Sequence, residues 1–186
     1  MNENSLGSGQ IGRYPGESDA QTVKRRWYAV LTTPQNEKSV ARHFDVREVE
    51  WFLPTYQTER VWRNRQRVSL LLPLFASYIF VRIGVRERTR VLQCPGVIRI
   101  VGTSREALPV ADSVIDFLRS DLGRQIEPFP HLVAGTRVRV KRGAMEGLEG
   151  ILIRKNDNLR FVLTVELINQ HAAVEIDAEH LESLIV

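Results

Sequence analysis

Apolar residues after residue 24 either alternate with polar ones or form short runs, and both patterns predict β-strands more often than long helices. In the first half of the chain we expect strands at residues 24–33, 50–62, 67–72, 78–83 and 97–101. A turn at residues 63–66 would join the second and third of these strands. Pro54 lacks a backbone donor, so the second strand should lie at a sheet edge or contain a bulge there.

Three segments between or after these strands have helical patterns. We expect helices over residues 34–44, 86–93 and 112–119. Thr33 followed by Pro34 is a typical helix start, and Asp112 can cap the last helix. The second helix should end before Pro95, because the residue before a proline disfavours helical backbone. The order β-α-β-β-β-α-β-α predicts an α+β fold in layers.

Residues 73–80 read PLFASYIF and contain no charged residue. Successive side chains of a strand point to opposite faces, so Ile79 and Val81 should share one face and Tyr78 and Phe80 the other. The second face continues to Arg82, and a lone arginine is rarely buried, so we expect an exposed aromatic patch there. A central strand covered on both faces is the alternative. Alternation places Phe75 with the core, unless the chain kinks nearby.

The pattern changes after residue 119. Residues 120–131 contain two prolines and a glycine without periodicity, which indicates a linker. Five short strand-like runs follow, separated by turn residues, and predict a small β-barrel with no switch to a helical form. We therefore expect a disordered extension at 1–23, one domain at 24–119 and a second at 132–186.

Charge is unevenly distributed between these regions. Residues 24–118 contain 16 Lys and Arg against 9 Asp and Glu, whereas residues 131–186 contain 7 against 8. The basic first half could bind nucleic acid or an acidic protein surface, although charge that serves only solubility is an equal alternative. No apolar run is long enough for a membrane span and no secretory signal begins the chain, so we expect a cytoplasmic protein.

Catalytic and metal-binding patterns are missing from the sequence. None of the four histidines has a metal-ligand spacing, and Cys94 precedes a proline where packing is a simpler explanation than nucleophilic chemistry. The carboxylates at predicted turns, such as Glu146 and Glu149, are more simply solvated than metal-binding. We expect no enzymatic activity, no cofactor and no metal.

The segment VKRGAMEGLEGIL places Gly143, Gly147 and Gly150 between two predicted strands. Glycines there allow positive φ and close backbone approach at the corners of a barrel. The segment resembles a KOW motif, the strand-loop-strand element of SH3-like barrels in transcription elongation factors and some ribosomal proteins. Any other small barrel is the alternative.

The first half resembles the N-terminal (NGN) domain of NusG-like factors. The matching segments are RWYAVLTTPQNEKSVARHF, FLPTYQTERVWRNRQRVSLLLPLFASYIFVRI and VLQCPGVIRIVG, in the family's order and spacing. With the KOW segment the resemblance covers residues 26–186. The family's Pro-Gly after PLF is Ala76-Ser77 here, which favours a specialised paralogue of the RfaH or UpxY type and a turn that is either relaxed or strained.

The resemblance implies a transcription elongation and antitermination factor, acting as a monomer on a specific operon such as a surface polysaccharide cluster. It implies that the clamp coiled coil of RNA polymerase contacts Leu31, Phe75, Tyr78 and Phe80, and that the opposite lobe contacts Arg88 and Thr89. Non-template DNA would meet Arg42, His43, Arg90 and Gln93. The KOW barrel would recruit a small-subunit ribosomal protein or the Rho helicase.

The basic hairpin RVWRNRQR offers Arg63 and Arg65 to phosphates, and Trp62 could stack on a base or pack on the domain. A housekeeping NusG-type factor, which couples transcription to translation or to Rho termination, is one alternative. A KOW-type RNA- or ribosome-binding protein is the other.

Overall fold

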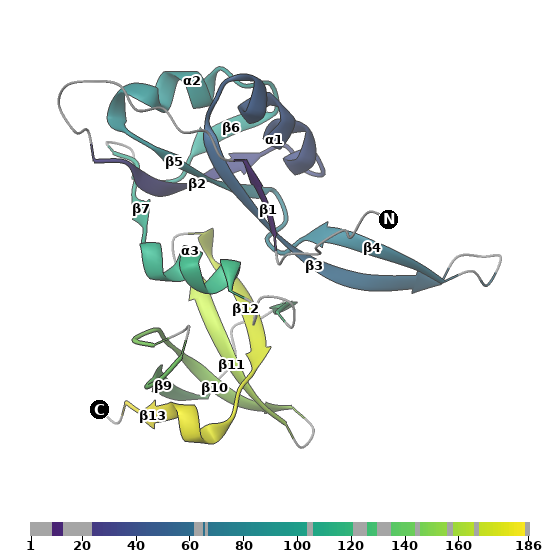
Figure 1. Cartoon of the computed structure of the whole chain (residues 1–186), viewed down its shortest axis with the longest axis vertical. Helices are drawn as coiled ribbons and strands as arrows, with labels where there is room; N and C mark the ends of the chain where they lie inside the picture. Colours follow the sequence, from purple (N-terminus) through teal and green to yellow (C-terminus); the bar gives the residue numbers. More distant parts are fainter. Residues whose placement is uncertain are drawn as a thin grey trace, which may run out of the picture.

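The computed structural model describes residues 9–12, 24–61, 65, 67–103, 106–120, 126–129, 135–143, 146–155, 158–165 and 168–184 (Figure 1). Arg63, predicted to meet phosphates, and Trp62, for which base stacking and packing on the domain were both left open, lie outside the described residues.

The first half forms an antiparallel sheet of order β1-β3-β5-β2-β6, in which β4 also pairs with β3 and β7 with β2. Its elements are β1 (Gly9–Gly12), β2 (Arg26–Thr32), α1 (Glu37–Val46), β3 (Glu50–Val61), β4 (Arg67–Pro73), β5 (Tyr78–Ile83), η1 (Val85–Glu87), α2 (Arg88–Leu92), β6 (Val97–Ile100), β7 (Pro109–Val110) and α3 (Asp112–Arg119). The predicted order of strands and helices is confirmed, with β1, η1 and β7 in addition.

Helix α1 begins at Glu37, so the prediction that it starts at Pro34 is wrong. The N-cap is Asn36, whose backbone N–H donates to the Thr33 carbonyl at 3.2 Å. Gln35 has a φ of 63°, a left-handed conformation that cannot continue a helix from Pro34. Thr33 and Pro34 therefore lie in a turn, in which the Asn36 amide also donates to Thr33 Oγ1 at 2.8 Å.

Besides β7, two further short strands were not predicted, and both lie in segments that were expected to be disordered or a linker. Strand β1 pairs with the outer edge of β3 from Gly9–Pro54 to Gly12–Trp51. Strand β8 (Glu127–Phe129), within the predicted linker, pairs with a strand of the second sheet. Residues 9–12 of the predicted disordered extension therefore form a strand, and residues 127–129 of the predicted linker belong to the second sheet. Strand addition at a sheet edge depends on backbone hydrogen bonds, which leave no alternating pattern in the sequence.

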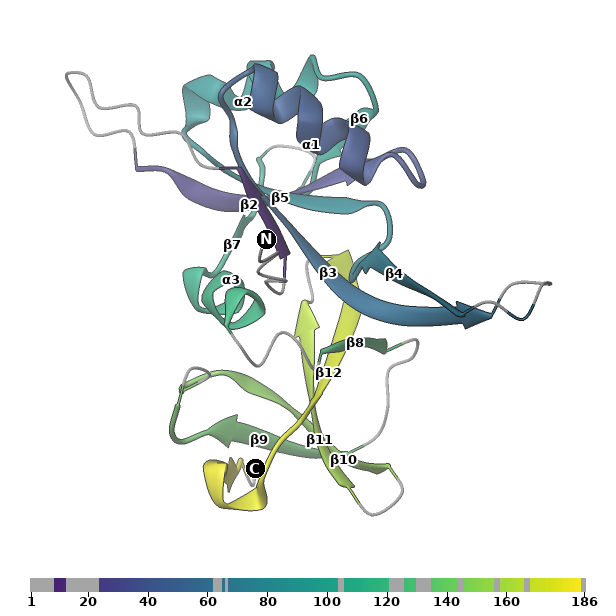
Figure 2. The same ribbon diagram turned by 45° about the vertical axis from the view of Figure 1, so that its right-hand side comes forward.

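The second half forms a six-stranded antiparallel sheet of order β13-β9-β10-β11-β12-β8. After β8 come β9 (Thr136–Val140), β10 (Glu149–Lys155), β11 (Asn158–Val165), β12 (Gln170–Glu175), η4 (Ala178–His180) and β13 (Leu181–Ser183). All five strands predicted here are present. Among the described residues β13 and β8 are the two edge strands and do not pair with each other. The sheet is therefore not closed into the predicted barrel (Figure 2).

Both faces of the first sheet are packed. One face carries Val30, Leu53, Ile79 and Val81 and packs on α1 and α2 through Val40, Phe44 and Val91. The opposite face carries Trp27, Phe52 and Phe80 and belongs to a second buried cluster, which also contains residues of α3 and of the second sheet. The alternation predicted for β5 is confirmed, because Ile79 and Val81 lie on the helix side and Tyr78 and Phe80 on the other.

Candidate functional site

Four residues predicted to contact one partner lie together on the sheet face opposite α1 and α2. Leu31 of β2 pairs with Tyr78 of β5, and Phe80 pairs with both Ala29 and Phe52 in the neighbouring strands. The Phe75 ring meets the Phe80 ring edge-on with 6.0 Å between centroids, and Phe52 stacks on Phe80 at 6.4 Å. We call this surface the covered face and define it by Trp27, Leu31, Phe52, Leu74, Phe75, Tyr78 and Phe80.

Phe75 reaches the covered face because the chain turns between β4 and β5. Ser77 has a φ of 66°, so strict alternation fails between Phe75 and Tyr78. The Tyr78 N–H donates to the Phe75 carbonyl at 3.2 Å, and the Leu74 N–H donates to the Pro54 carbonyl at 2.8 Å. The position of Phe75, which alternation could not decide, is therefore set by this turn. Of the two forms expected for Ala76-Ser77, the turn adopts the strained one.

The expectation that Tyr78 and Phe80 form an exposed patch is wrong. Phe80 is 0 % exposed and Tyr78 is half-buried, because both side chains pack in the cluster shared with α3 and the second sheet. Helix α3 contributes Ile115, Phe117 and Leu118 to that cluster. Figures 1 and 2 both show α3 between the first sheet and the second, with the ends of β11 and β12 directed at the first sheet. Sequence alternation along β5 cannot reveal a cover that comes from elsewhere in the chain.

Arg119, at the end of α3, is a contact that the sequence analysis missed. Its guanidinium carbon lies 4.5 Å from the centre of the Trp27 ring and 5.0 Å from that of Phe52. A guanidinium over an aromatic face is attracted by the ring quadrupole, and the attraction increases when water is excluded. Arg119 therefore holds the end of α3 on the covered face. The only signal in the sequence was an arginine at the end of an apolar helix.

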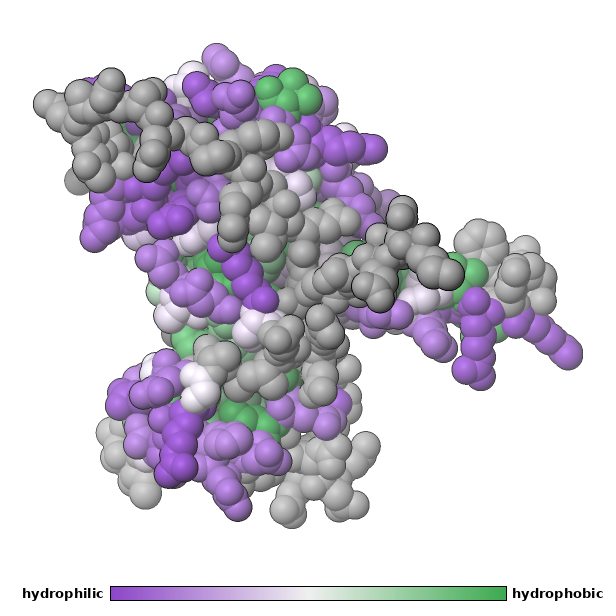
Figure 3. Space-filling view, in the orientation of Figure 1, coloured by the Kyte–Doolittle hydropathy of each residue, from purple (hydrophilic) through white to green (hydrophobic). Residues whose placement is uncertain are grey.

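The hairpin of β3 and β4 extends beyond the rest of the first sheet and away from the second sheet (Figure 1). We call this extension the arm. One side of the arm carries Tyr56, Leu70 and Leu72, all half-buried, and Tyr56 packs against the cluster of the covered face. Figure 3 shows hydrophobic residues both at the waist between the two halves and on the arm. Toward its tip the arm is basic, with Arg60, Arg65 and Arg67 exposed. The apolar surface of the covered face thus continues onto the arm.

The predicted DNA-contacting residues lie on the helix side of the first sheet. Arg42, Arg90 and Gln93 are exposed and His43 is half-buried. The Arg90 side chain donates to the carbonyl of Arg47 at 3.4 Å, which brings α2 to the end of α1 and adds Arg47 to this basic group. The nearby carboxylate of Asp45 accepts a hydrogen bond from Trp51 Nε1 at 2.9 Å. The side therefore presents mainly positive charge to solvent.

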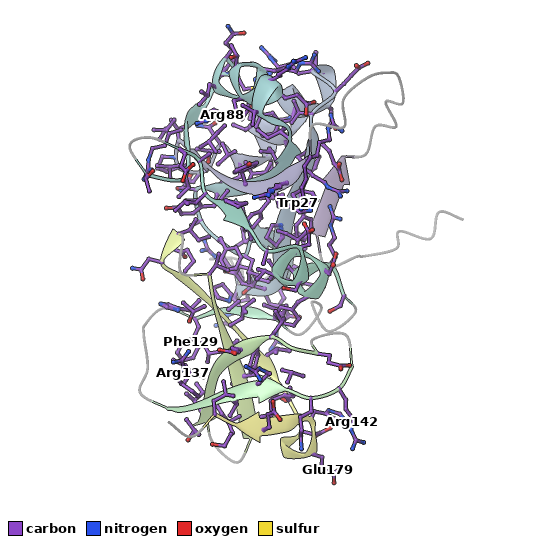
Figure 4. The ribbon with its side chains drawn as sticks, turned by 90° about the vertical axis from the view of Figure 1, so that its left-hand side faces the viewer. Trp27, Arg88, Phe129, Arg137, Arg142 and Glu179 are labelled. Atoms are coloured by element: carbon purple, nitrogen blue, oxygen red, sulfur yellow. The ribbon has the colours of Figure 1, made fainter. Side chains whose placement is uncertain are left out.

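Arg88 and Thr89 begin α2, with Arg88 half-buried and Thr89 exposed (Figure 4). The preceding turn is fixed by Glu87, which accepts the Gly84 N–H at 2.8 Å and pairs with Arg25, whose Nε lies 3.0 Å away. Partial burial by itself would raise the pKa of Glu87, but the hydrogen bonds from Arg25 and Gly84 outweigh it and lower that pKa. This ion pair attaches the start of α2 to the residue before β2.

The three KOW glycines have the backbone roles that their spacing predicts. Gly143 and Gly147 have φ values of 92° and 83°, in the left-handed region that favours glycine. Gly150 lies against Phe161, where an added Cβ would be 2.6 Å from the ring. The Gly147 N–H donates to the Val140 carbonyl at 2.8 Å, which returns the chain toward β10.

Charges on the second sheet largely neutralise one another. Arg139 donates to Glu149 at 2.6 Å and lies 3.6 Å from Glu182, while Arg137 lies 3.6 Å from Glu149. Figure 4 shows Arg137, Arg142 and Glu179 in the half that lies away from the first sheet. The basic strand TRVRV is therefore paired with acids, unlike the helix side of the first sheet.

Within the described ranges, no group of three or more His, Cys, Asp or Glu side chains is placed to hold a metal ion. None of the helices found there combines the length and apolar character that crossing a membrane requires.

A sheet with an apolar face, joined to a small all-strand sheet with a glycine hairpin, agrees with the arrangement that the resemblance to NusG-like factors implies. The family model described as "NusG: Transcription termination factor nusG" matches residues 25–119, half of the chain. The chain therefore belongs to the NusG family. Members of this family are non-enzymatic transcription factors that bind RNA polymerase and act in elongation and antitermination.

Whole-chain comparisons agree with this assignment. The transcription termination/antitermination protein NusG of Borreliella burgdorferi is 21% identical over 187 residues, which span 87% of this chain and all of that protein. The structure described as "Domain interaction in Thermotoga maritima NusG" is similar in fold, with a TM-score of 0.52 and 18% identity. It covers 89% of this chain and 100% of its own.

Proposed function

We propose that this protein binds RNA polymerase through the covered face and promotes processive elongation and antitermination. The observation that carries the proposal is the composition of that face. Leu31 from β2 and Phe75, Tyr78 and Phe80 from β5 and the turn before it converge there. Clustered aromatic side chains typically provide most of the binding energy of a protein interface. The clamp coiled coil of the polymerase is the partner, and the opposite lobe meets Arg88 and Thr89.

Binding in this way requires the second half of the chain to move. Helix α3 and the second sheet occupy the covered face, and the two sheets share no strand pairing among the described residues. Side-chain packing can be exchanged for a partner without breaking a backbone ladder. The solved relative from Thermotoga maritima is likewise described by an interaction of its domains. The closed form is therefore a resting state, and the polymerase binds the open one.

Two surfaces that stay accessible would support this docking. The apolar side of the arm, formed by Tyr56, Leu70 and Leu72, extends the contact beyond the covered part. The basic helix side, with Arg42, His43, Arg47, Arg90 and Gln93, suits the phosphates of the displaced non-template strand. Arg65, which is exposed toward the arm's tip, would add a phosphate contact, and we propose the same role for Arg63.

The role we propose is that of a specialised paralogue of the RfaH or UpxY type, acting on a particular operon. The replacement of Pro-Gly by Ala76-Ser77 supports it. The second half, a KOW-like sheet that remains in strands, would recruit a small-subunit ribosomal protein or Rho. A housekeeping role is the second candidate, favoured by the length and name of the Borreliella burgdorferi relative.

The test is a binding titration of the full chain against purified bacterial core RNA polymerase. Leu31→Ala combined with Tyr78→Ala removes two contacts that are half-buried, so the fold should survive, and affinity should fall at least about 30-fold. The matched control is Val46→Ala, which truncates an apolar residue that is 81% exposed at the end of α1. Unchanged affinity of the double variant, with circular dichroism like the wild type, would refute docking through this face.

A further inference from the structure

One interaction connects the helix side of the first sheet to the covered face. Glu37, the first residue of α1, is 4% exposed, and its Oε1 accepts the backbone N–H of Ser77 at 2.6 Å. The Ser77 carbonyl in turn accepts the Thr32 N–H at 2.8 Å. Both backbone groups of Ser77 are thus held, one by a helix and one by a neighbouring strand.

Ser77 needs such support because of its conformation. Its φ of 66° is in the left-handed region, where a Cβ crowds the backbone and which glycine adopts without this steric cost. Strain of this kind persists only when surrounding contacts determine the conformation. The buried Glu37 carboxyl, which reaches the turn from a different element, is such a contact.

The turn controls which residues the covered face contains. Regular alternation from β5 backward would put Phe75 on the side of Ile79, toward α1. With Ser77 left-handed, Phe75 instead lies beside Phe80 with its ring 6.0 Å away, and Leu74 joins the same cluster. Alternation already places Leu74 on the side of Tyr78, so loss of the left-handed turn would remove Phe75 from the covered face.

We propose that Glu37 is a positioning residue for the covered face. Its hydrogen bond keeps Ser77 left-handed and thereby holds Phe75 where α3, the second sheet and the polymerase all pack. The proposal rests on the function proposed above and deepens it, because it assigns control of the binding face to a residue on the opposite side of the sheet.

The test compares Glu37→Ala, Ser77→Gly and the double variant in the full chain. Glu37→Ala should weaken binding to purified core RNA polymerase about tenfold, which corresponds to the loss of one buried hydrogen bond. It should also accelerate amide hydrogen exchange at residues 74–80. Because glycine adopts this φ without support, Ser77→Gly should restore most of the affinity and the exchange protection to the Glu37→Ala protein.

Val49→Ala is the matched control for a purely structural effect. Val49 is buried in the cluster on the helix side, so its truncation should lower stability without altering exchange at residues 74–80, and Ser77→Gly should not rescue it. The positioning role is overturned if glycine at position 77 fails to rescue Glu37→Ala, or if Val49→Ala perturbs the turn equally.

The exchange measurement also separates the two proposals. If the wild-type chain does not bind the polymerase, the proposed function fails. Exchange at residues 74–80 in the free protein still decides whether Glu37 holds the turn.

Discussion

The two faces of the first sheet are equally apolar and both buried, yet they are covered in different ways. The helix side is packed by α1 and α2, which directly follow or precede strands of the same sheet. The covered face is packed by α3, which follows β7 of the same sheet, and also by strands of the second sheet, which begin after residue 126. No strand pairing joins the two sheets among the described residues.

The comparison separates a core that defines the fold from an interface inside the chain. A helix connected to its strand by a short turn cannot leave without unfolding the sheet. A second half attached through side-chain packing can separate as a unit, in the way that domains of one chain often move. The same kind of apolar surface is therefore structural on one side and available to a partner on the other.

The largest expected effect tests the helix side. Phe44→Ala removes a fully buried ring of α1 and should lower the free energy of unfolding by about 3–5 kcal/mol. Urea denaturation followed by circular dichroism measures the change. Val46→Ala at the exposed end of the same helix should change stability by less than about 0.5 kcal/mol. A loss below 1 kcal/mol for Phe44→Ala would show that this side is not the structural core.

The second largest expected effect concerns α3, which packs on the covered face. Ile115→Asp places a charge on the buried side of α3, so it should open the molecule while leaving α1 and α2 in place. Affinity for core RNA polymerase should rise about three- to tenfold, because a larger fraction of molecules is competent to bind.

Small-angle scattering should show a larger radius of gyration for Ile115→Asp than for the wild type. The control Asp116→Asn, on the exposed side of α3, should change neither the radius of gyration nor the affinity for polymerase. Weaker polymerase binding by the opened protein would mean that α3 belongs to the binding surface and does not obstruct it.

The smallest effect concerns the ion pair of Arg25 and Glu87 on the helix side. The pKa of Glu87 is lowered in the folded protein, so the carboxylate stabilises the fold at pH values above its unfolded pKa. That stabilisation should be lost as the pH falls below about 4.5 and through the folded pKa.

Because the pair is partly exposed, we expect it to contribute no more than about 1 kcal/mol. Thermal unfolding of wild type and Glu87→Gln should differ at pH 7 and converge at pH 3. A difference that grows as the pH falls would contradict the direction of the pKa shift.

Much of this arrangement was predictable from local patterns. Strands β2 to β6 and β9 to β13 follow from runs and alternation, and the two faces of β5 follow from the two-residue period of a strand. The glycines between β9 and β10 were predicted to allow positive φ or close backbone approach, and Gly143 and Gly147 have positive φ. The four polymerase-contact candidates were brought together by family resemblance, and the structure places them on one surface.

Other features depended on contacts that are distant in sequence. Strand β1 exists because β3 offers an unpaired edge, and the late start of α1 depends on a turn closed by Asn36 and Thr33. Phe75 could not be placed by alternation, because the left-handed turn at Ser77 interrupts the two-residue period of the strand. Arg119 over Trp27 gave no distinctive signal in the pattern.

By itself, the sequence determined which segments are strands and helices, which sides of them are apolar, and the family to which the chain belongs. Those properties are local, because they follow from periodicity, turn residues and short motifs. Only the tertiary structure decided that the aromatic surface of β5 is covered, and by which part of the chain. The composition of an apolar face predicts that the face is buried, because exposed apolar patches are unfavourable in water. The composition does not determine which surface buries it, because that depends on contacts distant in sequence.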